Sequence, residues 1–400
     1  MSFPDSKNFH QTEIEESSQK NKPDLKTIIK HTLLFVVTFG CVTFMGIFWV
    51  GHSAHAETYW EMWPQGVLFA VLFLAFLATH EFGHYFAAVY HNVKVSLPYF
   101  IPIPVGVGTL GAVIKIEEKI KDTRKLFDIG IAGPIAGFIV SLVILLYGFM
   151  TLPDPSFIKN FEGHAEVIEY VENTGTFPED APISTSEETA TIVFGQTLLF
   201  SFLSGFFDNV PPMYEMYHYP FLFAGWLGLF FTALNLTPIG QLDGGHILYS
   251  LIGYKNHRKV ARVGFGLITA LGGIEAISFL FTNIDTFFPG YGYTSILLWA
   301  LVLLFLLRKG FYNDHKWVAP IWALSLIASV GYLLIGIGDI SHSGSLIWTF
   351  WSFFLVYLVK MEHPPVIYEQ ELSPGRKRLG WISMGVFLLC ISPTPIYFLN

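Results

Sequence analysis

Cysteine is nearly absent from this 400-residue chain, which contains only Cys41 and Cys390. Each lies in an apolar stretch, so the sequence offers neither a disulfide framework nor a cysteine-rich zinc site. A metal ion bound by this chain must therefore be held by histidine and carboxylate side chains.

Charged residues are also scarce. They make up 14% of the chain, against about a quarter in soluble domains, whereas 52% of the residues are hydrophobic. This balance predicts an integral membrane protein. The expected partners are the lipid bilayer and membrane-spanning proteins, with no nucleic acid, and the sequence leaves the oligomeric state open.

Nine apolar runs approach or reach the length of about 20 residues that a helix needs to cross a bilayer. The expected spans are Ile28–Val50, Val67–Val89, Leu126–Met150, Phe221–Thr237, Val263–Phe281, Thr294–Leu307, Val318–Ile337, Leu346–Val359 and Trp381–Phe398. The fold class that follows is an all-α polytopic membrane protein with about nine transmembrane segments.

Lysine and arginine are almost missing from two of the connecting segments. Residues 51–64 have none, and residues 151–220 have only Lys159 beside many acidic residues. Lysine and arginine gather in four other connections, within residues 94–125, 255–262, 308–316 and 360–378, and positive charge favours the cytoplasmic side of a membrane. The alternation fits nine crossings with a cytoplasmic N-terminus and an external C-terminus. The apolar run at 191–207 is short for a span, and a crossing there would break this alternation.

The second span contains the sequence HEFGH at residues 80–84. A charged group inside a bilayer costs about 3 kcal/mol on insertion scales, so this cluster needs a functional explanation. Residues four apart share one face of a helix, so His80 and His84 can bind one metal ion together. Glu81 can reach a metal-bound water without being a ligand. The motif predicts a zinc hydrolase whose active site lies within the membrane, in its cytoplasmic half.

A third ligand is expected from another span that reaches the same depth. The fourth span ends in NLTPIGQLDGG at residues 235–245, where Pro238 and Gly240 interrupt the helix. Irregular backbone at membrane depth is tolerated only where protein or a water-filled cavity satisfies it. Asp243 is the candidate third ligand and completes a His-His-carboxylate site with one open position for water.

Together, HEFGH in one span and NxxPxxxLDGG at the end of another resemble the site-2 protease family of intramembrane zinc metalloproteases, peptidase family M50. The resemblance implies that His80, His84 and Asp243 bind one zinc ion per chain and that Glu81 is the general base. It also implies that Asn235 helps to hold the substrate carbonyl. The expected activity is hydrolysis of peptide bonds in transmembrane protein substrates near the cytoplasmic side, as in regulated intramembrane proteolysis.

The resemblance covers residues 66–253 and is closest to a subgroup without a PDZ domain, which includes bacterial members and plastid proteins linked to plant greening. It leads us to expect a protein of the bacterial cytoplasmic (inner) membrane. One departure is His246, where relatives would be expected to have arginine, and a contribution of His246 to the metal site therefore stays open.

Residues 96–116 contain two apolar runs of strand length around Gly106-Val107-Gly108, with prolines in the first run. This pattern predicts a membrane-associated β-hairpin that dips into the cytoplasmic leaflet next to the active site. An edge strand there could hold an unwound substrate by β-augmentation, as the family's hairpin is thought to do. Gly133 and Gly137 in the third span suit close packing against the HExxH helix.

Each interpretation has a less specific alternative. Asp243 could be a loop or capping residue, Asn235 could serve only an interhelical hydrogen bond, and the hairpin could be a packing element. Glu275 in the fifth span is expected to line a polar crevice or to pair with a neighbour. The alternative function is a metal or ion transporter, which should show paired sites or repeats and has no need of Glu81. An inactive scaffold is disfavoured because the predicted catalytic set is intact.

Three parts of the chain are expected. Residues 1–26 are polar and form a disordered cytoplasmic tail. Residues 27–260 form the first span and the metalloprotease core, with the external acidic loop at 151–220. Residues 261–400 form a C-terminal transmembrane bundle.

Overall fold

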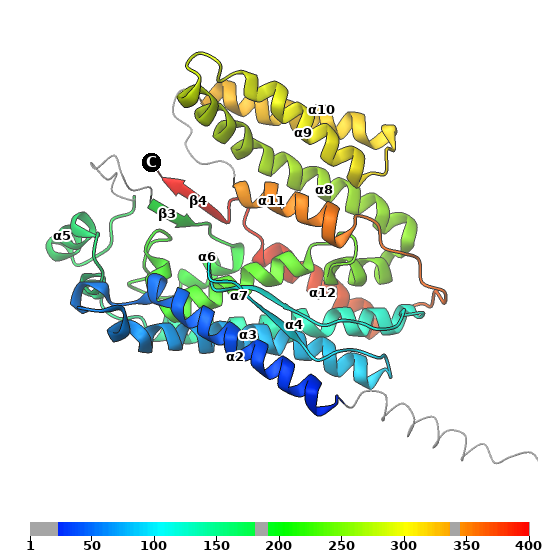
Figure 1. Ribbon diagram of the computed structural model, residues 1–400, viewed down its shortest axis with the longest axis horizontal. Coiled ribbons are helices and arrows are strands. Elements are labelled where there is room, and N and C mark those ends of the chain that lie inside the picture. The colour runs from blue at the N-terminus through cyan, green and yellow to red at the C-terminus, as the bar shows by residue number, and fades with distance from the viewer. Residues whose placement is uncertain (1–22, 181–190, 337–344, 400) are drawn as a thin grey trace, which may run out of the picture.

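The structure is a computed structural model that describes residues 23–180, 191–336 and 345–399. Helices dominate it (Figure 1). The main helices are α2 (Leu25–Val50), α3 (Trp63–Tyr90), α4 (Thr123–Met150), α7 (Pro220–Leu236), α8 (Asp243–Phe287), α9 (Thr294–Gly310), α10 (His315–Gly336), α11 (Leu346–Phe354) and α12 (Pro374–Cys390). The shorter elements are β1 (Tyr99–Pro102), β2 (Thr109–Val113), α5 (Ala165–Thr174), β3 (Thr191–Phe194), α6 (Leu198–Ser204), η4 (Met216–His218) and β4 (Ile396–Leu399).

Each of the nine predicted spans overlaps one of the main helices. Five described helical segments are long and apolar enough to cross a membrane: Leu25–Val50, Tyr59–Tyr90, Thr123–Met150, Asp243–Phe287 and His315–Ile335. Pro220–Leu236 and Leu346–Val359 are apolar but shorter. A helical integral membrane protein is thus confirmed, while the number nine stays a prediction. Residues 1–22 of the predicted tail lie outside the described residues.

The chain after α12 differs from the predicted ninth span, which extends to Phe398. Helix α12 ends at Cys390, and the following residues lead into strand β4. Pro393 and Pro395 explain the early end, because proline lacks a backbone N–H and disfavours helical geometry in the residue before it. The apolar run at 191–207 also forms no span, since it folds into β3 and the seven-residue helix α6.

Two backbone pairings join segments that are predicted to lie on the same side of the membrane. Strand β3 of the external loop pairs antiparallel with β4 near the C-terminus (Figure 1). At the other end of the helices, Asp122 forms a bridge with Tyr368, and both belong to basic connecting regions. These pairings agree with the alternation read from the charges.

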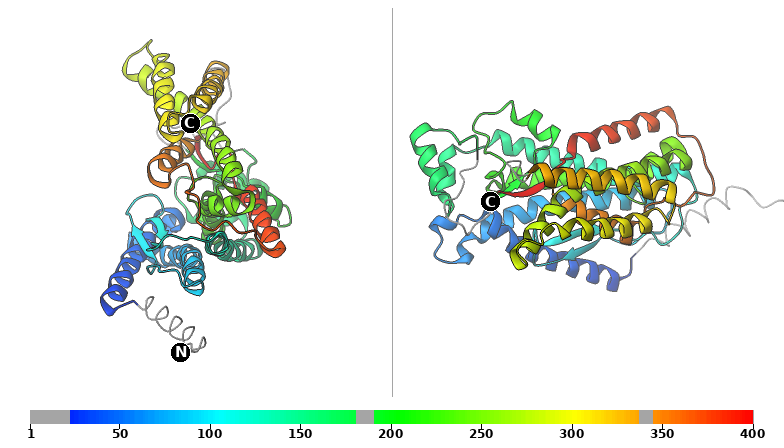
Figure 2. Two further views of the ribbon diagram at one scale, coloured as in Figure 1. Left: turned by 90° about the vertical axis from the view of Figure 1, so that its right-hand side faces the viewer. Right: turned by 90° about the horizontal axis from the view of Figure 1, so that it is seen from above.

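The centre of the molecule is formed by α3, α4 and α7. Helix α3 packs against α2 and α4, and α4 packs against α7. Large aromatic side chains between these helices are fully buried, among them Phe69, Phe73, Phe76, Phe223 and Trp226. Helix α8 connects this group to α9 and α10, which project from the rest (Figures 1 and 2). The two predicted histidine ligands therefore come from the tightly packed centre, and Asp243 lies at the start of α8 beside it.

Helix α8 consists of two helical parts joined at Gly253. The φ angle of Gly253 is 74°, in the left-handed region that glycine adopts without strain. The first part begins at Asp243, and the second part packs against α9, α10 and α11. The expected boundary between residues 260 and 261 falls inside the second part.

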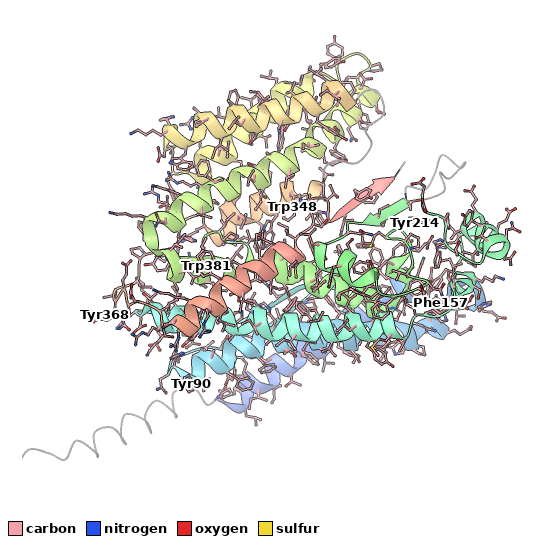
Figure 3. All side chains as sticks on the ribbon, turned by 180° about the vertical axis from the view of Figure 1, so that it is seen from behind. Tyr90, Phe157, Tyr214, Trp348, Tyr368 and Trp381 are labelled. Carbon is pink, nitrogen blue, oxygen red and sulfur yellow. The ribbon has the colours of Figure 1, made fainter. Side chains whose placement is uncertain are left out.

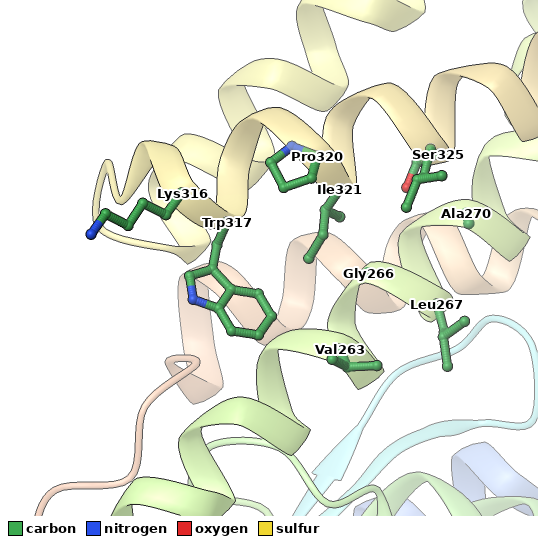
Figure 4. Close-up of a pocket in the computed structure, with 10 residues that line it drawn as sticks. Val263, Gly266, Leu267, Ala270, Lys316, Trp317, Pro320, Ile321 and Ser325 are labelled. Atoms are coloured by element: carbon green, nitrogen blue, oxygen red, sulfur yellow. The ribbon is translucent and has the colours of Figure 1, made fainter.

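The outer surface fits a lipid environment. Figure 3 shows Tyr90, Tyr368 and Trp381 toward one end of the helices, and all three side chains are exposed. Tyr59 and Trp60 are exposed at the other end of α3. Such aromatic side chains are enriched at both membrane–water interfaces. Between α8 and α10 lies an apolar cavity of about 390 Å³ lined by residues such as Leu267 and Ile321 (Figure 4).

The predicted hairpin is present within residues 96–116. Strands β1 and β2 pair antiparallel, with an irregularity after Phe100, and lie beside α2 (Figure 2). His31 Nδ1 donates to Pro98 O at 2.9 Å, and Trp49 Nε1 donates to Gly106 O at 2.9 Å. His31 and Trp49 are about 27 Å apart along a helix, so the hairpin follows most of α2.

Gly108 allows this close approach and provides a test of it. An added Cβ at Gly108 would meet the backbone of Val42, whereas one at Gly106 would meet nothing, although both glycines have positive φ. We expect both alanine variants to lose about 1–2 kcal/mol through the left-handed backbone. Gly108→Ala should lose about 1–3 kcal/mol more through overpacking.

The measurement is hydrogen exchange of residues 98–113 in detergent micelles. Gly108→Ala should exchange faster than Gly106→Ala. Equal exchange in the two variants would contradict the observed contact between the hairpin and α2.

Candidate active site

The three predicted metal ligands converge at one point. His84 Nε2 lies 3.2 Å from His80 Nε2 and 3.2 Å from Asp243 Oδ2, and His80 Nε2 lies 3.4 Å from Asp243 Oδ2. His80 is only 3% exposed and His84 is also buried, because α3 turns this face toward α4 and α8. The structure thus brings together a histidine pair from α3 and a carboxylate more than 150 residues later.

A tight turn places Asp243 against α3. Helix α7 ends at Leu236, and the chain passes through Gly240, whose φ is 56°, before α8 begins. A Cβ on Gly244 would collide with the carbonyl oxygen of Leu236, and one on Gly245 would collide with that of Gly240. Gly244 and Gly245 are therefore required because the start of α8 packs directly against the end of α7 and the turn that follows it.

The donor set fits a zinc ion. Two imidazole nitrogens and one carboxylate oxygen are typical zinc ligands, and bonds of about 2.0–2.1 Å in a tetrahedron place ligand atoms about 3.3 Å apart. His84 Nδ1 donates to Ile129 O at 2.7 Å, which leaves the Nε2 lone pair directed toward the cluster. The Nε2 atoms of His80 and His84 thus lie at a separation expected for two ligands of one cation.

Glu81 lines the same cavity as the three ligands. The cavity has a volume of about 250 Å³ and is also lined by Asn235 and by Ala112 and Val113 of β2. Glu81 is only 7% exposed, and its carboxyl group interacts with the backbone of Ile114, directly after β2. The carboxylate is therefore enclosed between the ligand helix and the hairpin.

Asn235 lies next to the ligand cluster, one residue before the end of α7. Its Nδ2 atom is 3.4 Å from His80 Nε2, and the residue lines the cavity. An amide at this position can reach a molecule bound in the cavity. Both residues that were predicted to be catalytic, Glu81 and Asn235, are therefore beside the predicted ligands.

The glycines of α4 lie directly against the histidines. A Cβ on Gly133 would collide with the His84 ring, and a Cβ on Gly137 would lie 3.1 Å from His80 Nδ1. In return, a Cβ on Gly83 of α3 would lie 2.7 Å from Ala132 O of α4. The close packing predicted for Gly133 and Gly137 against the HExxH helix is therefore found, and it occurs at the two predicted histidine ligands.

His246 has a partner outside the ligand cluster. Its Nδ1 atom lies 2.8 Å from His363 Nε2, although His246 also lines the cavity. His363 stacks on Tyr249 with ring centroids 4.4 Å apart, and burial lowers the pKa of His363. The sequence does not predict this pair, because 117 residues separate its members. Glu275 does not line the cavity.

Comparison with known proteins agrees with this geometry. Residues 68–272, just over half of the chain, match the pattern of peptidase family M50. The chain belongs to peptidase family M50. The predicted resemblance to the site-2 proteases is thereby confirmed, and it extends into the second part of α8.

Several similar curated proteins are plant proteins named as probable zinc metalloproteases. The probable zinc metalloprotease EGY2, chloroplastic, of Oryza sativa subsp. indica is 26% identical over 250 residues, which are 62% of this chain and 37% of the relative. The probable zinc metalloprotease EGY1, chloroplastic, of Arabidopsis thaliana is 31% identical over 202 residues, 49% of this chain and 30% of the relative. The chain thus spans about a third of the length of these relatives. No solved structure matches the chain.

The contact between Gly133 and His84 leads to a prediction. Gly133→Ala should push the His84 ring out of the cluster, and we expect zinc affinity to fall about 10- to 100-fold, as when an outer-shell partner is lost. Gly331→Ala is the matched control, because Gly331 lies in α10 and an added Cβ there meets nothing. Zinc per chain would be measured by inductively coupled plasma mass spectrometry. Unchanged zinc affinity in Gly133→Ala would show that α4 does not position His84.

Proposed function

We propose that this chain is an intramembrane zinc metalloendopeptidase of the site-2 type that cleaves membrane-spanning proteins near the cytoplasmic side of the bilayer. The observation that carries the proposal is the convergence of His80, His84 and Asp243 in one cavity with Glu81, on helices long enough to span a membrane. Family membership and relatives named as probable zinc metalloproteases support it.

The proposed zinc ligands are His80 Nε2, His84 Nε2 and the carboxylate of Asp243. A zinc ion bound by these atoms would supply Lewis acidity and lower the pKa of a coordinated water. The Ile129 carbonyl fixes the orientation of the His84 ring by accepting a hydrogen bond from Nδ1. The turn that includes Gly244 and Gly245 holds Asp243 in place.

Glu81 is proposed as the general base. Its carboxylate can take a proton from the attacking water in the cavity and deliver it to the leaving amine of the cut peptide bond. Asn235 is proposed to donate its amide N–H to the substrate carbonyl oxygen, where negative charge develops. Its position beside His80 Nε2 supports this role.

Strand β2 is proposed to present the substrate. A transmembrane helix must unwind before a peptide bond becomes accessible, and the freed backbone groups need partners within the membrane. Ala112 and Val113 of β2 line the cavity, while Leu110 and Val113 are exposed apolar side chains. An extended substrate segment could pair with this strand while its scissile bond lies beside Glu81.

The proposed side of cleavage follows from the position of the histidines on α3. His80 is ten residues before the end of the helix at Tyr90, and basic residues such as Lys94 follow that end. We place residues 27–260 in the protease core, residues 151–220 outside as an acidic loop, and residues 261–400 in the C-terminal bundle. The proposed location is a bacterial cytoplasmic membrane with the N-terminus in the cytoplasm. The relatives named as chloroplastic lend no support to this location.

A transporter is the weaker alternative. It would need a polar route from the cluster toward the far side of the bilayer. Within the described part of the chain, the helices on that side of His80 are packed with fully buried aromatic side chains, including Phe73, Phe76 and Trp226. An apolar core of this kind favours a closed hydrolytic site.

Replacement of the general base tests the mechanism. Glu81→Gln should lower the rate of cleavage about 10²- to 10⁴-fold, because proton transfer is lost, while zinc stays bound. A comparison of the membrane proteomes of wild-type and Glu81→Gln cells would identify proteins that accumulate uncut, and cleavage of one of these would then be measured directly. Glu275→Gln is the matched control, since it alters a carboxylate in another spanning helix. Wild-type cleavage by Glu81→Gln would exclude the mechanism.

Replacement of Asn235 tests its role separately. Asn235→Ala should lower kcat about 10²-fold through loss of a donor to the developing oxyanion, with unchanged zinc content and thermal stability. The measurement is cleavage of the same substrate at saturating concentration. A loss of stability with normal kcat would instead indicate an interhelical role.

A further inference from the structure

A second cluster of metal-binding side chains lies at the other end of α7. His164 directly precedes α5, Glu215 directly precedes η4, and His218 ends η4 just before α7 begins. His218 Nε2 lies 3.0 Å from His164 Nε2 and 3.6 Å from Glu215 Oε2, and His164 Nδ1 lies 2.9 Å from Glu215 Oε1. These separations resemble those between the ligands of the proposed active site.

The cluster is enclosed, and one of its oxygens lacks a partner. Glu215 is 2% exposed and His218 is 6% exposed. Glu215 Oε2 is buried and accepts no hydrogen bond from the described residues. A buried polar atom left without a partner costs about 1–3 kcal/mol, so a bound ion is a physical explanation for its position. Burial also raises the pKa of Glu215 and lowers that of His218 well below its usual range.

The contacts of the two imidazole rings bring their Nε2 atoms close together. His218 Nδ1 lies 3.1 Å from Trp49 O, an acceptor, so this nitrogen donates its proton. His164 Nδ1 lies 2.9 Å from Glu215 Oε1, so this ring and this carboxylate share either a hydrogen bond or a cation. The Nε2 atoms of His164 and His218 lie 3.0 Å apart, and they form a hydrogen bond only if one of them carries a proton. A cation between them would satisfy both nitrogens.

This arrangement repeats the pattern of the first cluster. There, His84 Nδ1 donates to a backbone carbonyl while its Nε2 atom faces a second imidazole nitrogen at 3.2 Å. Histidine ligands of metals almost always donate their other N–H to a carbonyl or carboxylate in this way. Two imidazoles and one carboxylate form a donor set suited to zinc.

We propose that His164, Glu215 and His218 together bind a second divalent metal ion, zinc by the chemistry of the donors. The site would fasten the segment that carries His164 to the start of α7 and to the end of α2, where Trp49 lies. It is separate from the active site. His218 and Asn235 lie 17 residues apart, about 26 Å along a helix, and the buried side chains of Phe223 and Trp226 lie between them.

The competing explanation is a proton in place of the metal. A doubly protonated His164 could donate to both His218 Nε2 and Glu215 Oε1. The cluster would then be an ion pair with an attached neutral histidine, and no metal would bind.

Zinc counting separates the two explanations. Protein carrying an affinity tag without histidine would be purified in detergent, dialysed against a weak chelator and measured by inductively coupled plasma mass spectrometry. We expect two zinc ions per wild-type chain and one in a His80→Ala/His84→Ala variant. Adding Glu215→Gln or His218→Ala should remove the remaining ion. Adding His55→Ala should leave it in place, because His55 is an exposed histidine near the end of α2.

Cobalt provides a second readout that does not depend on removing a ligand of the second site. Co²⁺ added to folded His80→Ala/His84→Ala protein should give visible absorption bands, and zinc should displace them. Folding would be checked by gel filtration and circular dichroism. If that variant does not fold, zinc is counted in the wild type and in Glu215→Gln: one ion fewer in Glu215→Gln supports the second site, and equal counts overturn it. One ion in the wild type and none in the double variant would overturn the proposal. One ion in both would retain the second site and reject the first.

Discussion

The close contact between α3 and α4 is the constraint on which the rest of the site depends. Gly133 and Gly137 remove the side chains that would otherwise occupy the space of the His84 and His80 rings. Helix α4 also supplies the Ile129 carbonyl, which accepts a hydrogen bond from Nδ1 of His84. Helix α4 thus sets the distance to both histidines and the orientation of His84, so small residues in this helix position the proposed ligands as well as allow close packing.

The site also depends on hydrogen-bond partners for polar groups that lie inside an apolar molecule. The irregular backbone between α7 and α8 is tolerated because it borders a cavity and lies in protein, and it delivers Asp243 to the histidines. The hairpin closes the same cavity from another side through β2. The nitrogens of His84 are satisfied by Asp243 and by the Ile129 carbonyl, whereas Nδ1 of His80 is buried without a hydrogen-bond partner among the described residues.

Helix α2 connects features that are far apart in the sequence. The Trp49 indole donates to Gly106 at the tip of the hairpin, and the Trp49 carbonyl accepts from His218. The hairpin beside the active site and the histidine cluster before α7 thus share one anchor. This common contact explains how an element that lines the cavity can be held along nearly the whole length of α2.

The sequence by itself determined the features that depend on local spacing. The interval between His80 and His84 fixed a shared helix face, and apolar runs fixed most of the helices. The strand-length runs around Gly106 indicated the hairpin, and the motif near Asp243 pointed to the third ligand. Tertiary structure decided the length of the hairpin along α2, the early end of α12, the His246–His363 pair and the cluster around Glu215. These features join residues tens to hundreds of positions apart, and such contacts arise from the packing of whole helices, which no local periodicity encodes.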